Sequence, residues 1–135
     1  MERLKERLLI ARKALGTFLE LAAKEGYAKS PSLERRNAAI QRFEYSFEAV
    51  WKAVQLYLNE REALSTGSPK GCIRASRELG LLSEPEAEIA LKMAEARNLT
   101  AHTYDEGVAR HLYENLPAYG ESLNLWLEKV ENIFS

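Results

Sequence analysis

Residues 97–104 read Arg-Asn-Leu-Thr-Ala-His-Thr-Tyr and form the most concentrated cluster of chemically capable side chains in this sequence. The guanidinium of Arg97 offers a planar fork of N–H donors that suits phosphate or carboxylate oxygens. The imidazole of His102 can give or take a proton near neutral pH. Asn98 could orient a phosphate or the imidazole, and Tyr104 adds a hydroxyl. On a regular helix Arg97 and Tyr104 would share one face, while Asn98 and His102 would share another.

Composition argues against several other kinds of chemistry. With two histidines and one cysteine, a zinc site of the usual kind cannot be assembled within one chain. No Glu-x-x-His pair suggests a di-iron bundle, and neither a phosphate-cradling glycine loop nor a nucleophile elbow is present. We therefore expect no metal and no cofactor. The formal net charge of -1 gives no overall basic field, so any contact with RNA must come from a local patch or from a surface shared between subunits.

Small residues surround Arg97 on its own helical stripe, at Ala90, Ala94 and Ala101. Such a stripe lets a neighbouring helix approach closely, so we expect Arg97 at a helix–helix or subunit seam. A guanidinium in that position needs an acidic or phosphate partner, because an unpaired buried charge is costly.

A purely structural role for the cluster is the alternative interpretation. Arg97 could form an ion pair with Glu44 or Glu48 of the preceding long helix. His102 could satisfy backbone carbonyls at a helix end, and Tyr104 could simply pack. Structural ion pairs are common, and the residue types alone do not decide between the two interpretations.

Helices are expected to position this cluster, because apolar residues recur at steps of three and four. The first stripe predicts a helix that is ended by Gly26 and the run Ser30-Pro31-Ser32. The second predicts a helix from about 33 to 59, with Trp51 widening the stripe. The stripe residues are Leu4, Leu8, Ala11, Leu15, Phe18 and Ala22 in the first helix, and Ile40, Phe43, Phe47, Val50, Val54 and Leu58 in the second.

Capping signals mark the later helices. Ser68 and Pro69 suit the start of a short third helix, which Gly80 would close in a left-handed cap. Ser83 and Glu86 form a capping box for a fourth helix that runs toward position 100. A fifth helix begins near position 105, and its stripe contains Val108, Leu112, Tyr119, Leu123, Trp126 and Val130. Pro117 should kink or split that helix.

The predicted fold is all-α, an up-and-down bundle of four long helices plus a short one, with the last helix kinked near Pro117. The 135 residues suffice for one domain, 1–135. The charged N-terminus carries no apolar signal core, and no stretch is apolar enough to span a bilayer. Because Cys72 is alone and cannot form an intramolecular disulfide, a cytoplasmic location is expected.

The motif resembles a known superfamily. Arg-Asn-x-x-x-His-x-Tyr at the end of a penultimate helix is similar to the signature of the HEPN superfamily. Residues 41–52, Gln-Arg-Phe-Glu-Tyr-Ser-Phe-Glu-Ala-Val-Trp-Lys, resemble the second-helix pattern of the nucleotidyltransferase substrate-binding family. Its C-terminal pattern resembles residues 99–104 followed by Ala109, Tyr113, Pro117 and Tyr119. The similarity extends from the first helix to Phe134. One departure is Gly107 in the first turn of the last helix, which touches no motif residue.

The resemblance implies a partner and a reaction. Proteins of this kind are encoded beside a small nucleotidyltransferase and were first described as its substrate-binding partner. Related pairs are toxin and antitoxin, in which the HEPN protein is a metal-independent ribonuclease that the transferase silences by moving AMP onto a tyrosine. Carried over to this sequence, Arg97 and His102 would be catalytic, assisted by Asn98, and Tyr104 would accept AMP.

Two further expectations follow from that reading. One chain supplies a single strong acid–base group, so a homodimer with a shared cleft is expected, in which Arg97 and His102 are doubled. Basic residues near the cleft would then hold RNA by its phosphates, and their alternative role is a solvated charged face. The candidates are Arg42 and Lys52 on the second helix, and Lys70, Arg74 and Arg77 on the third.

Three functions therefore stay open on sequence grounds. The first is a homodimeric ribonuclease toxin controlled by a nucleotidyltransferase. The second is a non-catalytic subunit that presents substrate to that transferase. The third is a helical dimerisation module in which the motif only stabilises a seam.

Overall fold

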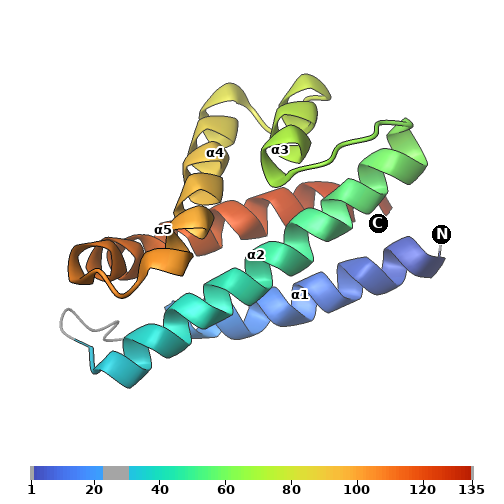
Figure 1. Cartoon of the computed structure of the whole chain (residues 1–135). Helices are drawn as coiled ribbons and strands as arrows, with labels where there is room; N and C mark the ends of the chain where they lie inside the picture. The colour runs from blue at the N-terminus through green and yellow to red at the C-terminus, as the bar shows by residue number, and fades with distance from the viewer. Residues whose placement is uncertain (1, 23–30, 135) are drawn as a thin grey trace.

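Five α-helices account for most of the chain in the computed structural model, which describes residues 2–22 and 31–134 (Figure 1). The helices are α1 (Glu2–Ala22), α2 (Leu33–Glu62), α3 (Pro69–Glu78), α4 (Glu84–Leu99) and α5 (Glu106–Glu131). Short 3-10 turns follow α4 (η1, Thr100–His102) and α5 (η2, Asn132–Phe134). The described residues contain no strand, so the all-α prediction, with four long helices and one short one, is confirmed.

Side-chain caps set where several helices begin. The Ser68 hydroxyl accepts a hydrogen bond from the Gly71 amide at 3.0 Å, with Pro69 in the first turn of α3. The Ser83 hydroxyl and the Glu86 carboxylate complete a reciprocal capping box at the start of α4. These interactions satisfy N–H groups that have no partner within the helix. Gly80, between the two helices, has φ +80°, a conformation that glycine adopts without steric cost.

Two boundaries differ from the prediction. Helix α2 continues to Glu62 rather than ending near position 59, and Ala63 closes it with φ 55°. A left-handed alanine has no sequence signature, because that position usually carries glycine. Helix α5 runs through Pro117 as one helix, so a split there is wrong, whereas a kink stays a prediction. The predicted stop signals at 26 and 30 lie outside the described residues.

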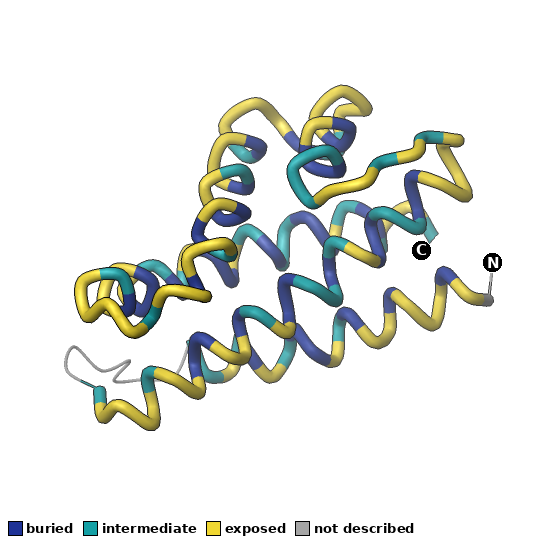
Figure 2. The backbone as a smooth tube through the Cα atoms, viewed as in Figure 1, coloured by how far each residue is buried: buried dark blue, intermediate teal, exposed yellow. Residues whose placement is uncertain are grey.

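The core lies among α1, α2 and α5, which all pack against one another, while α3 and α4 form a second unit above them (Figure 1). Helix α4 packs on α5, and α3 bridges α4 and α2. In the view of Figure 1, α4 stands steeply across the long helices, so the bundle is not a set of parallel rods. Buried positions recur along α1, α2 and α5 on the sides that face each other (Figure 2). The predicted stripes supply most of this core.

Aromatic side chains join the three long helices at the centre of the core. The Phe43 ring of α2 is fully buried. Its centroid lies 5.9 Å from the ring of Phe18 on α1, 6.0 Å from Phe47 on the same helix and 5.5 Å from Tyr119 on α5. Tilted aromatic contacts at such distances add stabilisation beyond the buried area alone. This cluster fixes which face of α2 points inward.

Buried polar groups tie α3 to α5. The Trp126 indole N–H donates a hydrogen bond to the Ser76 hydroxyl at 3.0 Å, and that hydroxyl donates to the Cys72 carbonyl at 2.8 Å. Ser76 and Trp126 are both completely buried. Next to them, the Cys72 sulfur lies 2.9 Å from the Thr66 hydroxyl. Helix α3 is therefore held by hydrogen bonds as well as by apolar packing.

Within the described residues, no helix combines the length and the apolar character needed to cross a bilayer.

The buried pair gives a stability prediction. Ser76→Ala removes the acceptor of the Trp126 N–H and should lower the free energy of unfolding by about 1–3 kcal/mol, because a buried donor loses its partner. Urea unfolding followed by circular dichroism measures this loss. Ser65→Ala, at an exposed hydroxyl in the loop before α3, is the matched control and should change little. Trp126→Phe should cost less in the Ser76→Ala background than in the parent, and simple additivity would contradict the proposed coupling.

Candidate functional site

Arg97 lies at the C-terminal end of α4, and its side chain reaches α2. Its Nη1 is 3.5 Å from the Glu44 carboxylate and donates to the Thr100 hydroxyl at 2.8 Å, and its Nη2 is 3.8 Å from Glu48. The ion pairs that the structural interpretation assigned to Arg97 are therefore present, and its side chain links α4 to α2. Because α4 packs mainly on α3 and α5, a close seam at Arg97 stays a prediction.

Helix α4 ends at Leu99, earlier than a continuous helix through the motif would require. The Thr100 hydroxyl donates to the Arg97 carbonyl at 2.7 Å, and the chain then tightens into η1. Regular helical geometry therefore stops before Tyr104. The premise that one regular helix carries Arg97 through Tyr104 is therefore wrong, and the shared faces drawn from it no longer follow.

A surface pocket of about 490 Å³ opens beside Arg97, between α2, α4 and the start of α3. The Nε of Arg97 and the Nε1 of Trp51 belong to residues that line the pocket, but both atoms are buried beneath the accessible surface and have no hydrogen-bond acceptor among the described residues. Arg97 and Lys70 supply positive charge, and Glu48 supplies an acceptor. The pocket is lined by Phe47, Glu48, Trp51, Ser68, Pro69, Lys70, Ala94, Arg97 and Asn98.

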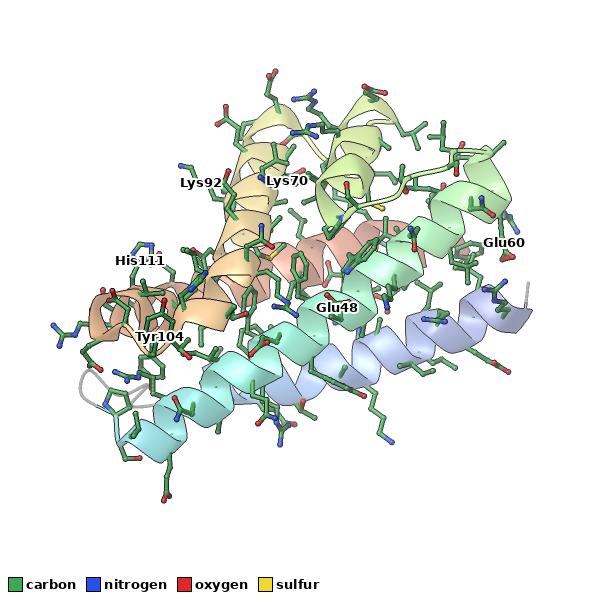
Figure 3. All side chains as sticks on the ribbon, viewed as in Figure 1. Glu48, Glu60, Lys70, Lys92, Tyr104 and His111 are labelled. Carbon is green, nitrogen blue, oxygen red and sulfur yellow. The ribbon has the colours of Figure 1, made fainter. Side chains whose placement is uncertain are left out.

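His102 and Tyr104 occupy a different place. Nδ1 of His102 lies 3.3 Å from the Tyr104 hydroxyl, and the two rings meet edge to face with centroids 5.8 Å apart. The Tyr104 side chain is 84% exposed, and Figure 3 shows it at the turn between α4 and α5, away from Glu48. His102 does not line the Arg97 pocket. Of the predicted catalytic residues, the structure groups Asn98 with Arg97 and leaves His102 with Tyr104.

An ion pair anchors the turn that carries His102 and Tyr104. The Arg36 guanidinium of α2 binds the Glu106 carboxylate of α5 with both terminal nitrogens, at 2.7 and 2.9 Å. This hydrogen bonding lowers the pKa of Glu106 and raises that of Arg36. Just before Glu106, the Asp105 carboxylate accepts a hydrogen bond from the Val108 amide at 3.2 Å and caps α5. The turn is thus held at its C-terminal side by two independent contacts.

One predicted phosphate-binding residue lies at the pocket. Lys70 lines it and also reaches Glu95 of α4 at 3.2 Å. Figure 3 shows Lys70 at the start of α3, near α4.

The other predicted basic residues are elsewhere. Lys52 approaches Glu48 at 3.8 Å but lines a separate groove between α1 and α2. Arg42 borders another part of the α1–α2 surface, and Arg74 and Arg77 are exposed on α3. The five predicted residues therefore do not form one patch with Arg97.

Sequence reasoning missed the contribution of α3 to the pocket. Ser68 and Pro69 were recognised as capping residues, and Trp51 as a stripe residue, but all three also line the pocket. A half-buried tryptophan at the edge of an apolar stripe was the available signal. Across residues 2–22 and 31–134, no three His, Cys, Asp or Glu side chains are grouped to hold a metal ion.

Comparison with known proteins gives a family match and a similar solved structure. Residues 6–132 match the family described as nucleotidyltransferase substrate binding protein like. A crystal structure of a protein from Thermus thermophilus is 52% identical in sequence and superimposes with a TM-score of 0.80. The match covers 87% of this chain and 96% of that one. No curated protein matches the sequence.

The Arg36–Glu106 contact predicts a pH dependence of stability. Because the folded-state pKa of Glu106 is lowered, its contribution is present above the ordinary carboxyl pKa of 4.5 and is lost as the pH falls below it. The difference in melting temperature between the parent and Glu106→Gln should therefore stay constant near neutral pH and shrink in acid. Thermal melts at a series of pH values measure it, with the exposed Glu114→Gln as the control. A difference that persisted unchanged into acid would contradict the assignment.

Proposed function

Because this chain belongs to the nucleotidyltransferase substrate binding protein like family, we propose that it is a non-catalytic subunit that binds a nucleotidyltransferase and presents that enzyme's substrate. The observation that carries the proposal is the pocket beside Arg97, whose lining combines aromatic side chains with charged donors. A bound ligand with acceptor oxygens would pair with the charged donors that line this pocket.

The chemistry of the pocket indicates a small ligand of mixed polarity. Trp51 and Phe47 offer apolar surface, Arg97 and Lys70 offer charged donors, and Glu48 offers a carboxylate. Such a combination of apolar walls with a few placed polar groups is typical of ligand pockets. The carboxylates near Arg97 argue against a site for phosphate alone, since they would repel it.

The separation of His102 from Arg97 favours the non-catalytic role over ribonuclease activity within one chain. General acid–base catalysis at a phosphodiester needs the imidazole and the stabilising cation to reach the same reacting atoms. In this chain His102 contacts Tyr104 instead. A homodimer whose seam brings Arg97 of one protomer to His102 of its partner would remove this objection.

One observation favours the ribonuclease toxin as the second candidate. Tyr104 is highly exposed, and its hydroxyl lies 3.3 Å from Nδ1 of His102. In the adenylylation reaction its oxygen would attack the α-phosphorus of ATP, pyrophosphate would leave, and His102 could take the phenolic proton. The added AMP would bring negative charge and bulk to the turn. Such control would make sense if the unmodified protein cleaved RNA.

RNA cleavage distinguishes the two candidates. We expect the purified chain, incubated with total RNA in EDTA, to leave the RNA intact, because Arg97 is held by carboxylates and His102 is elsewhere. Gel electrophoresis of the RNA measures the outcome, with His102→Ala run in parallel. Cleavage by the parent that disappears in His102→Ala would overturn the non-catalytic proposal and support the toxin.

Ligand presentation gives a second test. With the partner nucleotidyltransferase present, Trp51→Ala should weaken activity toward the presented substrate about tenfold, through loss of the pocket wall. The exposed Tyr104→Phe should leave that activity unchanged. Intact-protein mass spectrometry after incubation with ATP shows whether Tyr104 itself is modified. An adenylylated parent and an unmodified Tyr104→Phe variant would favour the second candidate.

A further inference from the structure

A second groove lies between the N-terminal half of α1 and the C-terminal half of α2. It has a volume of about 410 Å³ and is closed at one side by the segment that leads into α3. Its lining residues are Arg3, Arg7, Lys52, Gln55, Leu56, Asn59, Ser65 and Thr66. None of them lines the Arg97 pocket, so the groove is a separate feature.

The groove gathers positive charge without acidic neighbours in its lining. Arg3 and Arg7 are one helical turn apart on α1, and both are exposed. Neither forms an ion pair with a side chain in the described part of the chain. Lys52 faces them from α2, and its contact with Glu48 is long, at 3.8 Å. A bound anion would complement the positive charge that these three side chains bring to the groove.

Neutral polar groups complete the lining. The Gln55 amide donates to the Thr66 carbonyl at 2.6 Å, which fixes the segment before α3 against α2. Asn59 and Ser65 add an amide and a hydroxyl that can donate to an anion. The segment that lines the groove beside the cations is therefore fixed by a hydrogen bond before any ligand binds.

We propose that this groove binds a polyphosphate group, meaning two or three linked phosphates, as in pyrophosphate or the tail of a nucleoside triphosphate. Two guanidiniums and an ammonium match the several charges of such a ligand better than the single charge of a carboxylate. No aromatic ring lines the groove, so it lacks the stacking surface that single-stranded nucleic acid commonly uses. Recognition rests on the phosphates and not on a base. The proposal is independent of the function assigned to the Arg97 pocket.

Calorimetry with tripolyphosphate tests the proposal on the full chain. The parent should bind it with one site per chain, and Arg3→Gln or Arg7→Gln should each weaken binding about tenfold, as expected for loss of one charged hydrogen bond. Arg35→Gln removes the same charge from an exposed position at the opposite end of α2 and should bind like the parent. Thermal melts without ligand show that each variant is folded.

Three results would overturn the proposal. The first is no binding of tripolyphosphate by the folded parent. The second is equal weakening by Arg35→Gln, which would mean that only net charge matters. The third is binding of single-stranded oligothymidylate through Arg3 and Arg7 while tripolyphosphate fails to bind, which would make the groove a nucleic-acid site instead.

Discussion

The rotational setting of α2 is the constraint on which the rest of the structure depends. The buried ring of Phe43 meets aromatic rings of α1, α2 and α5, and turning it outward would empty the centre of the core. Glu44 and Glu48 follow Phe43 and Phe47 by one residue each, so they must stand at the edge of the buried face. The Arg97 side chain of α4 reaches that edge. The contacts that hold Arg97 are therefore a consequence of aromatic packing in the core.

The early end of α4 decides how the motif is divided. Had the helix continued, its residues would have projected at regular intervals. Instead the Thr100 hydroxyl bonds both to the Arg97 carbonyl and to its side chain. The change of direction that follows sends His102 and Tyr104 to the surface of the turn, where the Arg36–Glu106 contact holds the start of α5. A single copy of the chain thus presents Arg97 and the His102–Tyr104 pair at two separate places.

The fold was predictable from sequence because its signals are local. Apolar stripes and the caps at Ser68 and Ser83 each act within one or two helical turns, and the helices formed where they indicated. The acidic partners of Arg97 were also among the expected alternatives. The part that α3 plays in the pocket could not be predicted, because it depends on contacts between distant segments. The ends of α4 and α2 are local, but neither Thr100 nor the left-handed Ala63 is a residue type that usually marks the end of a helix.

The burial of the Cys72 thiol makes its alkylation a measure of local unfolding. Cys72 is fully buried at the base of α3, and burial raises the pKa of its thiol, so little thiolate is present at neutral pH. An alkylating reagent can therefore reach it only when α3 detaches from the core. Since the sequence contains one cysteine, the rate of labelling reports the opening of that helix without any engineered probe. The native chain thus carries its own sensor of local unfolding next to the wall of the Arg97 pocket.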